Sequence, residues 1–196
     1  MVLKKIFGLT VILMLLSSCE KASHTTRYKP KTKEEILEKR LIRFFSAGYD
    51  KDNPFVGVWQ ANTKDLQKLL KEKFLAKYKA KPDEASKKLL ESRLKEVKNY
   101  IRLLPLGQAL MMSVSYNGVP GMSSGTWKKR TKNKIEIHWK NKKKKVQAMA
   151  TLLDKNKFLY VEALGKISYV RFTKSAKEEA RNIIDKLRSF GSLPEY

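Results

Sequence analysis

The chain has one cysteine and two histidines among its 196 residues. A single cysteine excludes a framework of internal disulfides and any metal site made of clustered cysteines, and two histidines argue against a histidine-rich metal or catalytic centre. Acidic residues are also scarce, since 19 Asp and Glu stand against 43 Lys and Arg and the formal charge is +24. The composition is 42% hydrophobic and 10% aromatic. This hydrophobic and aromatic content is too high for a disordered basic tail. The length is that of one domain, with or without an additional segment.

A hydrophobic run long enough to span a membrane is missing from the start of the chain. Residues 6–16 are almost wholly apolar, but eleven residues of helix reach only about 16 Å, against about 30 Å of hydrocarbon. Lys4 and Lys5 precede this segment, and a polar stretch follows it. This order, a positively charged start followed by a short apolar run and small residues, is typical of an export signal. We therefore expect residues 1–18 to be a signal peptide that is removed.

The end of that segment, Leu16-Ser17-Ser18-Cys19, resembles the lipobox of bacterial lipoproteins, with the only cysteine at the required position. The resemblance implies that Cys19 becomes the first mature residue and carries a diacylglycerol with fatty-acyl chains such as palmitate. Two or three acyl chains anchor a protein stably without a spanning helix. Glu20 stands where enteric bacteria place the Asp that retains lipoproteins in the inner membrane, so an outer-membrane location is favoured. The alternative is an ordinary cleaved signal followed by a chance cysteine.

Beyond a polar tether over residues 19–31, the chain predicts a single α+β domain over residues 32–196. Apolar spacing after a capping box at Thr32 and Glu35 predicts a helix over 33–47, and a second capping box at Ser175 and Glu178 predicts a closing helix. Residues 55–59 read as a strand, and residues 62–104 as two helices broken at Pro82.

Alternating residues and short turns predict six further strands, over 108–116, 121–129, 134–140, 146–153, 158–163 and 167–173. Short turns join only antiparallel neighbours. The expectation is therefore a seven-stranded antiparallel meander, half open or closed into a barrel. The helical pair is inserted after its first strand.

Two Gly-x-Trp units, Gly57-Val58-Trp59 and Gly125-Thr126-Trp127, lie on these strands, and each glycine is expected to leave room for the neighbouring indole. An early Gly-x-Trp strand, a meander and a late helix resemble the lipocalin-like domains of many bacterial lipoproteins. The resemblance implies that Trp59 and Trp127 belong to the core and that Arg171 packs over Trp59. Lipocalins have eight strands and no helical pair, however. Seven strands can stay half open with the helices plugging them, and then no ligand cavity need exist.

Motifs that carry chemistry are weak. Gly121-Met122-Ser123-Ser124-Gly125 matches the nucleophile elbow of hydrolases, but a strand follows it instead of a helix, and His138 precedes the later acids. His138 and Glu136 are expected on the same outward face of a strand, with neither orienting the other. Ser92 and Lys95 match a motif of penicillin-recognising enzymes whose partner motifs are absent. We expect no catalytic residues, no cofactor and no metal.

Positive charge is the feature most suited to binding. Residues 127–157 hold twelve Lys and Arg against two acids. The candidate contacts for anionic polymers are Lys128, Lys129, Arg130, Lys142, Lys143, Lys144 and Lys145. The two groups lie at opposite ends of a strand about 23 Å long, beyond a Debye length of about 8 Å, so they should form two patches.

The expected partners are the membrane, through the lipid on Cys19, and anionic lipids, lipopolysaccharide or glycans. Export and the lack of base-stacking motifs make nucleic acid a poor partner. The leading hypothesis is a lipid-anchored, non-enzymatic protein of the bacterial envelope that binds such polymers or serves envelope maintenance. The alternatives are a lipocalin-like carrier of a small apolar ligand, and an inhibitor or assembly factor for another envelope protein.

Overall fold

The structure is a computed structural model, and it describes residues 32–46, 48, 50, 52–77, 83–141, 144–153, 158–162 and 166–191. The predicted signal peptide, the tether and Cys19 lie outside these residues, as does the expected helix break at Pro82.

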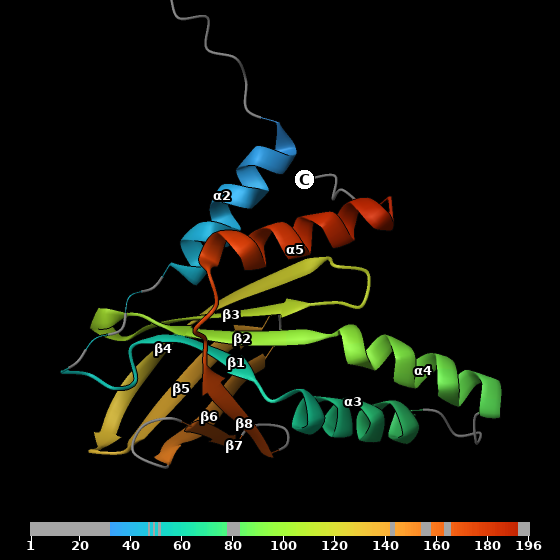
Figure 1. Cartoon of the computed structure of the whole chain (residues 1–196). Coiled ribbons are helices and arrows are strands. Elements are labelled where there is room, and N and C mark those ends of the chain that lie inside the picture. Colours follow the sequence, from blue (N-terminus) through green and yellow to red (C-terminus); the bar gives the residue numbers. More distant parts are fainter. Residues whose placement is uncertain are drawn as a thin grey trace, which may run out of the picture. The chain divides into compact units, whose positions relative to one another are not determined.

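Eight antiparallel strands form a closed barrel in which each strand pairs with the next along the chain and the last pairs with the first (Figure 1). The strands are β1 Gly57–Ala61, β2 Lys98–Leu103, β3 Gln108–Val114, β4 Pro120–Thr131, β5 Lys134–Asn141, β6 Lys144–Leu153, β7 Phe158–Glu162 and β8 Lys166–Arg171. The predicted antiparallel meander is confirmed, and so is closure, the second of the two forms expected. Closure pairs the edges of the sheet and so removes its free edge strands.

The predicted strand count of seven is wrong, because β2 was assigned to the second helix of the insertion. The helix ends at Glu96, and Lys98–Leu103 form a strand between β1 and β3. Ile101 and Leu103 face the barrel interior, whereas Tyr100 is buried on the outer side. Because both faces of this strand are buried, apolar residues occur on both, and the sequence does not alternate between apolar and polar residues. The spacing of its apolar residues fits a helical period instead.

In the described part of the chain, four α-helices accompany the barrel: α2 Lys33–Phe45, α3 Thr63–Lys77, α4 Glu84–Glu96 and α5 Ala176–Ser189, with a short 3₁₀ turn, η1, at Pro105–Gly107. The insertion of a helical pair after the first strand is confirmed. The side chain of Asn62 accepts the backbone amide of Lys64 at the start of α3, and Asp83 accepts that of Ser86 at the start of α4. Ser175 precedes α5 as predicted, but its side chain makes no capping hydrogen bond.

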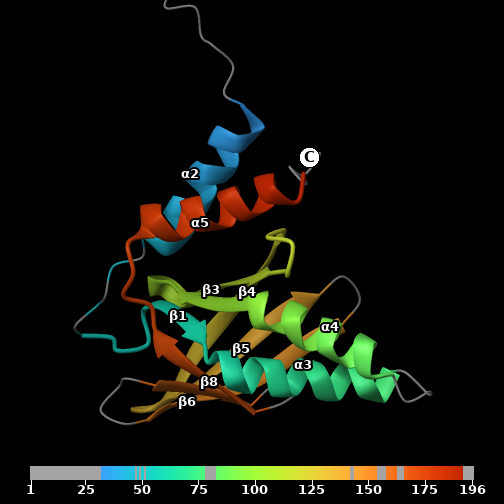
Figure 2. The same ribbon diagram turned by 45° about the vertical axis from the view of Figure 1, so that its right-hand side comes forward.

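A first core lies outside the barrel, between the outer face of β1–β3 and the helices α2 and α5 (Figures 1 and 2). Leu41 and Phe45 of α2, Leu187 of α5 and Tyr100 of β2 belong to this core. The ring of Phe45 meets that of Tyr100 edge to face, with centroids 5.0 Å apart. The two predicted terminal helices therefore cover one side of the barrel together.

The second core fills the barrel. It contains the indoles of Trp59, Trp127 and Trp139, together with Ile135 and Ile137 of β5. Predicted alternation in β5 is thus confirmed, since 135, 137 and 139 point inward while His138 is exposed on the outer side. An eight-stranded barrel has an interior of the width that side chains, or one small ligand, can fill.

Candidate functional site

One end of the barrel is closed around Trp59. The guanidinium of Arg171 lies over the Trp59 ring, with Cζ 4.3 Å from the centroid, as the sequence led us to expect. Arg171 also donates to the carbonyls of Val56 and Pro54, and the Trp59 indole donates to the carbonyl of Phe55 at 2.9 Å. These bonds tie the segment before β1 across the barrel end.

The role expected for the glycines of the Gly-x-Trp units is wrong in detail. A Cβ on Gly57 would meet Arg171 Nη1 at 2.8 Å, so this glycine makes room for the arginine and not for its own indole. At Gly125 a Cβ would clash with the carbonyl of His138 and touch the ring of Trp139, the residue that faces it on β5. Both glycines thus allow a close approach by a neighbouring strand.

Toward the opposite end of the barrel, side chains of the inner side are less buried. Met111 and Ser113 of β3 and Ser123 of β4 share the inner side with Ala109 and Gly125, yet all three are partly or fully exposed. At this end Asn99 donates to the Ser113 hydroxyl at 2.7 Å. Asn99 in turn accepts a hydrogen bond from the hydroxyl of the buried Tyr169 at 2.8 Å. A polar chain therefore lies at this end.

Two buried polar atoms on the inner side have no hydrogen-bond partner among the described residues: Ser123 Oγ and Trp139 Nε1. A buried donor left unpaired costs free energy unless a ligand or water satisfies it. Helix α3 contacts β8 and β2 at this end, and its Leu66, Leu69 and Leu70 pack against the barrel core. The half-open sheet plugged by helices is not what forms, since the barrel closes by itself and α3 packs against its end.

The hairpin between β4 and β5 carries the first predicted basic patch. Lys128, Lys129, Lys132 and Lys134 are exposed, and none of them forms an ion pair with a described residue. Arg130 differs, because its guanidinium pairs with Glu136. Four cations of the hairpin thus remain available to an outside anion.

Glu136 lies on the outer face of the barrel but is only 3% exposed. It accepts hydrogen bonds from Arg130 and Gln147, and His138 Nε2 lies 3.1 Å from its Oε1. The bond from Arg130 is the main reason that the pKa of Glu136 is lowered. The expectation that Glu136 and His138 stay independent is therefore wrong, since alternate residues on one strand face are close enough to pair.

The second predicted basic patch stays a prediction. Lys142 and Lys143 lie outside the described residues, and so do Lys155 and Lys157. Lys144 and Lys145 begin β6, but their side chains are likewise outside the description.

The structure does not bring the catalytic motifs together. Gly121–Gly125 lies within the continuous strand β4, with no turn into a helix. Ser123 is on the inner side of the barrel and His138 on the outer side. Ser92 lies on α4 and donates its hydroxyl to the carbonyl of Leu89. Within the described ranges, no group of three or more His, Cys, Asp or Glu is placed to hold a metal.

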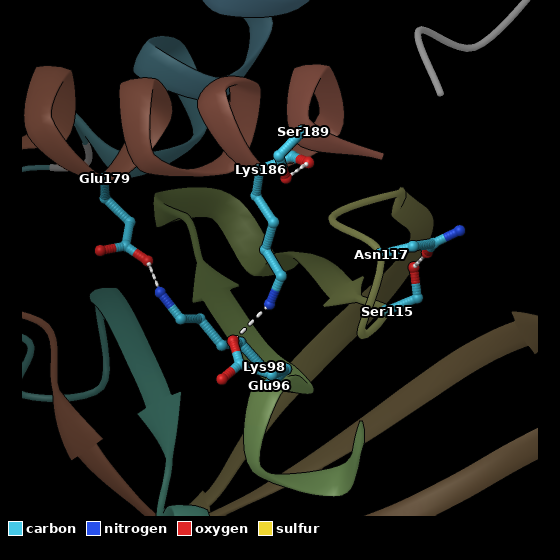
Figure 3. Close-up of polar contacts among 7 residues, drawn as sticks. All are labelled: Glu96, Lys98, Ser115, Asn117, Glu179, Lys186 and Ser189. Atoms are coloured by element: carbon cyan, nitrogen blue, oxygen red, sulfur yellow. Dashed lines mark hydrogen bonds and ion pairs between the residues drawn. The ribbon is translucent and has the colours of Figure 1, made fainter. Parts of the chain in front are cut away.

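Sequence reasoning missed a buried carboxylate at the junction of α5 and β2. Glu179 is 1% exposed and accepts hydrogen bonds from Lys98 Nζ and the Tyr100 hydroxyl, each at 2.6 Å. Figure 3 shows Lys98 reaching up to Glu179 while Lys186 reaches from α5 down to Glu96. Burial raises the pKa of Glu179, but the two hydrogen bonds outweigh it and the net pKa is lowered. The signal available was a glutamate on the apolar stripe of the closing helix.

No family model, curated protein or solved structure matches this chain. None of the helices in the described part has the length and apolar character needed to cross a bilayer.

Proposed function

We propose that the protein is a lipid-anchored, non-enzymatic envelope lipoprotein that holds a barrel of the lipocalin type beside a membrane and binds anionic polymers with its β4–β5 hairpin. The lipobox at Cys19 supports the anchor. The lipocalin type is supported by the closed eight-stranded meander and by the contact of Arg171 with Trp59. Glu20, which stands in place of the retention Asp, favours an outer-membrane location.

The observation that carries the binding role is the set of unpaired cations on one hairpin. Lys128, Lys129, Lys132 and Lys134 project from two strand ends and the turn between them, while the local acid, Glu136, is buried and already occupied. Each lysine near an anionic surface contributes about 1 kcal/mol. Lipid phosphates, lipopolysaccharide and sulfated glycans all present the repeating negative charge that such a hairpin suits.

The test is binding to immobilised heparin and to lipopolysaccharide at several salt concentrations. Replacing the four hairpin lysines by Gln should weaken binding about ten-fold or more and flatten the dependence of log Kd on log salt. The matched control replaces four exposed cations elsewhere by Gln, namely Lys33, Lys39, Lys177 and Arg181. Equal losses in both variants would mean that only net charge matters, and the hairpin proposal would fail.

A second candidate function, a carrier of a small apolar ligand, is favoured by unpaired polar groups inside the barrel. Ser123 Oγ and Trp139 Nε1 are buried on its inner side and have no hydrogen-bond partner among the described residues. Ligand sites of this kind combine apolar walls with a few polar groups that orient the ligand.

Quenching of tryptophan fluorescence by long-chain fatty acids tests this second role. Ser123→Leu places bulk inside the barrel and should abolish saturable quenching. Ser124→Leu, one residue away on the outer side, should leave it intact. Unsaturable quenching by wild type, or identical titrations for the two variants, would exclude the carrier.

A further inference from the structure

The two inserted helices meet along an unusual seam. α3 and α4 lie side by side in both ribbon views (Figures 1 and 2) and contact each other directly. Yet α4 has no buried residue, and Leu89 on it is 52% exposed. Helix pairs are ordinarily held by interlocking apolar side chains. The apolar contribution to holding α4 in place is therefore limited to half-buried side chains such as Leu90 and Leu94.

Polar and charged side chains line the seam instead. A cleft of about 280 Å³ opens between the helices. Its walls are Lys64, Gln67, Lys68, Lys71, Glu91, Leu94 and Lys95. Four lysines thus face one glutamate. Lys71 Nζ lies 2.6 Å from Glu91 Oε1, which is the ion pair that joins the two helices.

The remaining charge in the cleft is unbalanced. Lys64, Lys68 and Lys71 follow each other at helical spacings of four and three, so they share one side of α3, and like charges so placed repel. Lys95 approaches the same cleft from α4. With Glu91 held by Lys71, three positive charges of the cleft remain without an ion pair to a described residue. A compact polyvalent anion would relieve this repulsion and join the helices.

A neighbouring cleft shows why the seam is the better anion site. The second cleft, of about 240 Å³, lies between α3 and β8 and is lined by Asp65, Lys68, Leu69, Glu72 and Lys166. Its two acids balance its two lysines. Asp65 is also occupied, because it accepts the backbone amide of Ser168 at 3.0 Å. Lys68 lines both clefts, so the acids of the second cleft also offset part of its charge, whereas Lys64 and Lys95 line the seam alone.

We propose that the cleft between α3 and α4 binds a compact phosphate-bearing anion, through Lys64, Lys68 and Lys95, and that this anion fastens α4 to α3. The ligand chemistry is a phosphate group with two or more negative charges in reach of several ammonium groups, supplied either by a small soluble phosphate compound or by a lipid headgroup. The site is separate from the β4–β5 hairpin, and it does not depend on the lipid at Cys19.

The test uses the full chain with inorganic pyrophosphate as the soluble probe and chloride at equal ionic strength as the blank. Pyrophosphate should raise Tm in a saturable way. The double variant Lys68→Gln, Lys95→Gln should weaken that effect about ten-fold or more in apparent Kd. The matched control, Lys73→Gln with Lys88→Gln, removes one exposed cation from each helix outside the cleft and should bind as wild type does.

The anion-free proteins provide a second readout. Lys68→Gln removes repulsion from Lys64 and Lys71, whereas Lys95→Gln removes an attraction to Glu91 four residues earlier on α4. The double variant should therefore be about as stable as wild type in chloride, which excludes misfolding as the cause of lost binding. Flotation with vesicles of phosphatidylglycerol and phosphatidylcholine, against phosphatidylcholine alone, identifies the source. Seam-dependent flotation without a pyrophosphate effect assigns a lipid headgroup, and the reverse assigns a soluble phosphate.

The proposal is overturned if neither probe binds, or if the seam and control variants lose binding equally. The hairpin variant with four Gln substitutions separates this outcome from the proposed function. It should keep its pyrophosphate response while losing affinity for heparin, so that either idea can fail alone.

Discussion

Trp59 and Arg171 are direct partners in the β1–β8 pairing that closes the barrel, and the guanidinium of Arg171 also lies 4.3 Å from the centroid of the Trp59 ring. This pair is one of three that join the first strand to the last, and it also covers an end of the interior. The arginine is further held by the carbonyls of Val56 and Pro54. The planar guanidinium can stack on the Trp59 ring and donate to both carbonyls at once, which a lysine ammonium cannot do.

Substituting Gly57→Ala should destabilise the protein by about 1–3 kcal/mol. The added methyl would lie 2.8 Å from Arg171 Nη1, and the backbone of Gly57 has φ +135°, a conformation that L-residues rarely adopt. The measurement is the free energy of unfolding in urea. Gly48→Ala is the control, since nothing lies within 4 Å of its Cβ position, and it should change stability by less than about 0.5 kcal/mol. Equal effects at the two glycines would contradict the close packing described for Arg171.

Glu179 should make stability depend on pH in the acid range. Its pKa is lowered from the ordinary 4.5, so the folded state binds its proton less readily than the unfolded state. The stabilisation is therefore complete above about pH 5 and is lost as pH falls below 4.5 and through the lowered pKa.

Glu179→Gln removes this contribution. At pH 7 the variant should be less stable than wild type by about 1–3 kcal/mol, because Lys98 loses its charged partner in a buried site. Unfolding in urea between pH 7 and pH 3 should show the two proteins converging as the pH falls. Parallel curves would show that Glu179 has the same pKa in both states.

Position 106 should be better occupied by a residue that readily adopts the left-handed backbone conformation. It is fully exposed and has φ +66°, although it is neither glycine nor asparagine. Leu106→Asn should therefore raise the free energy of unfolding by up to about 1 kcal/mol, since no buried contact is lost and backbone strain is relieved. Leu153→Asn, at another exposed leucine within a strand, should bring no such gain. A loss of stability in Leu106→Asn would point to a packing role for this side chain.

Much of the barrel follows from the sequence because its strands and turns are local signals. In β5 the alternation of Ile135 and Ile137 with polar neighbours predicted which side faces inward, and burial agrees. β2 could not be recognised this way. Its outer face is covered by α5 and its inner face by the barrel core, so Tyr100 and Ile101 are both buried and the alternation disappears.

The candidate sites were predictable only where charge is concentrated in sequence. The hairpin lysines follow one another, and they were recognised. The seam between α3 and α4 brings Lys68 and Lys95 to one cleft from separate helices, and Glu179 meets Lys98 across 81 residues. Such groupings depend on how helices pack, which residue periodicity alone does not determine.

The lipid anchor at Cys19 tests the proposed place of this protein in the cell most directly. The measurement is the intact mass of the protein recovered from membranes, compared with that of Cys19→Ser. The proposal predicts a wild-type species that begins at Cys19 and carries a diacylglycerol, with or without an N-terminal acyl chain, whereas Cys19→Ser carries none. A membrane-recovered protein that retains residues 1–18, or one whose Cys19 is unmodified, would contradict it.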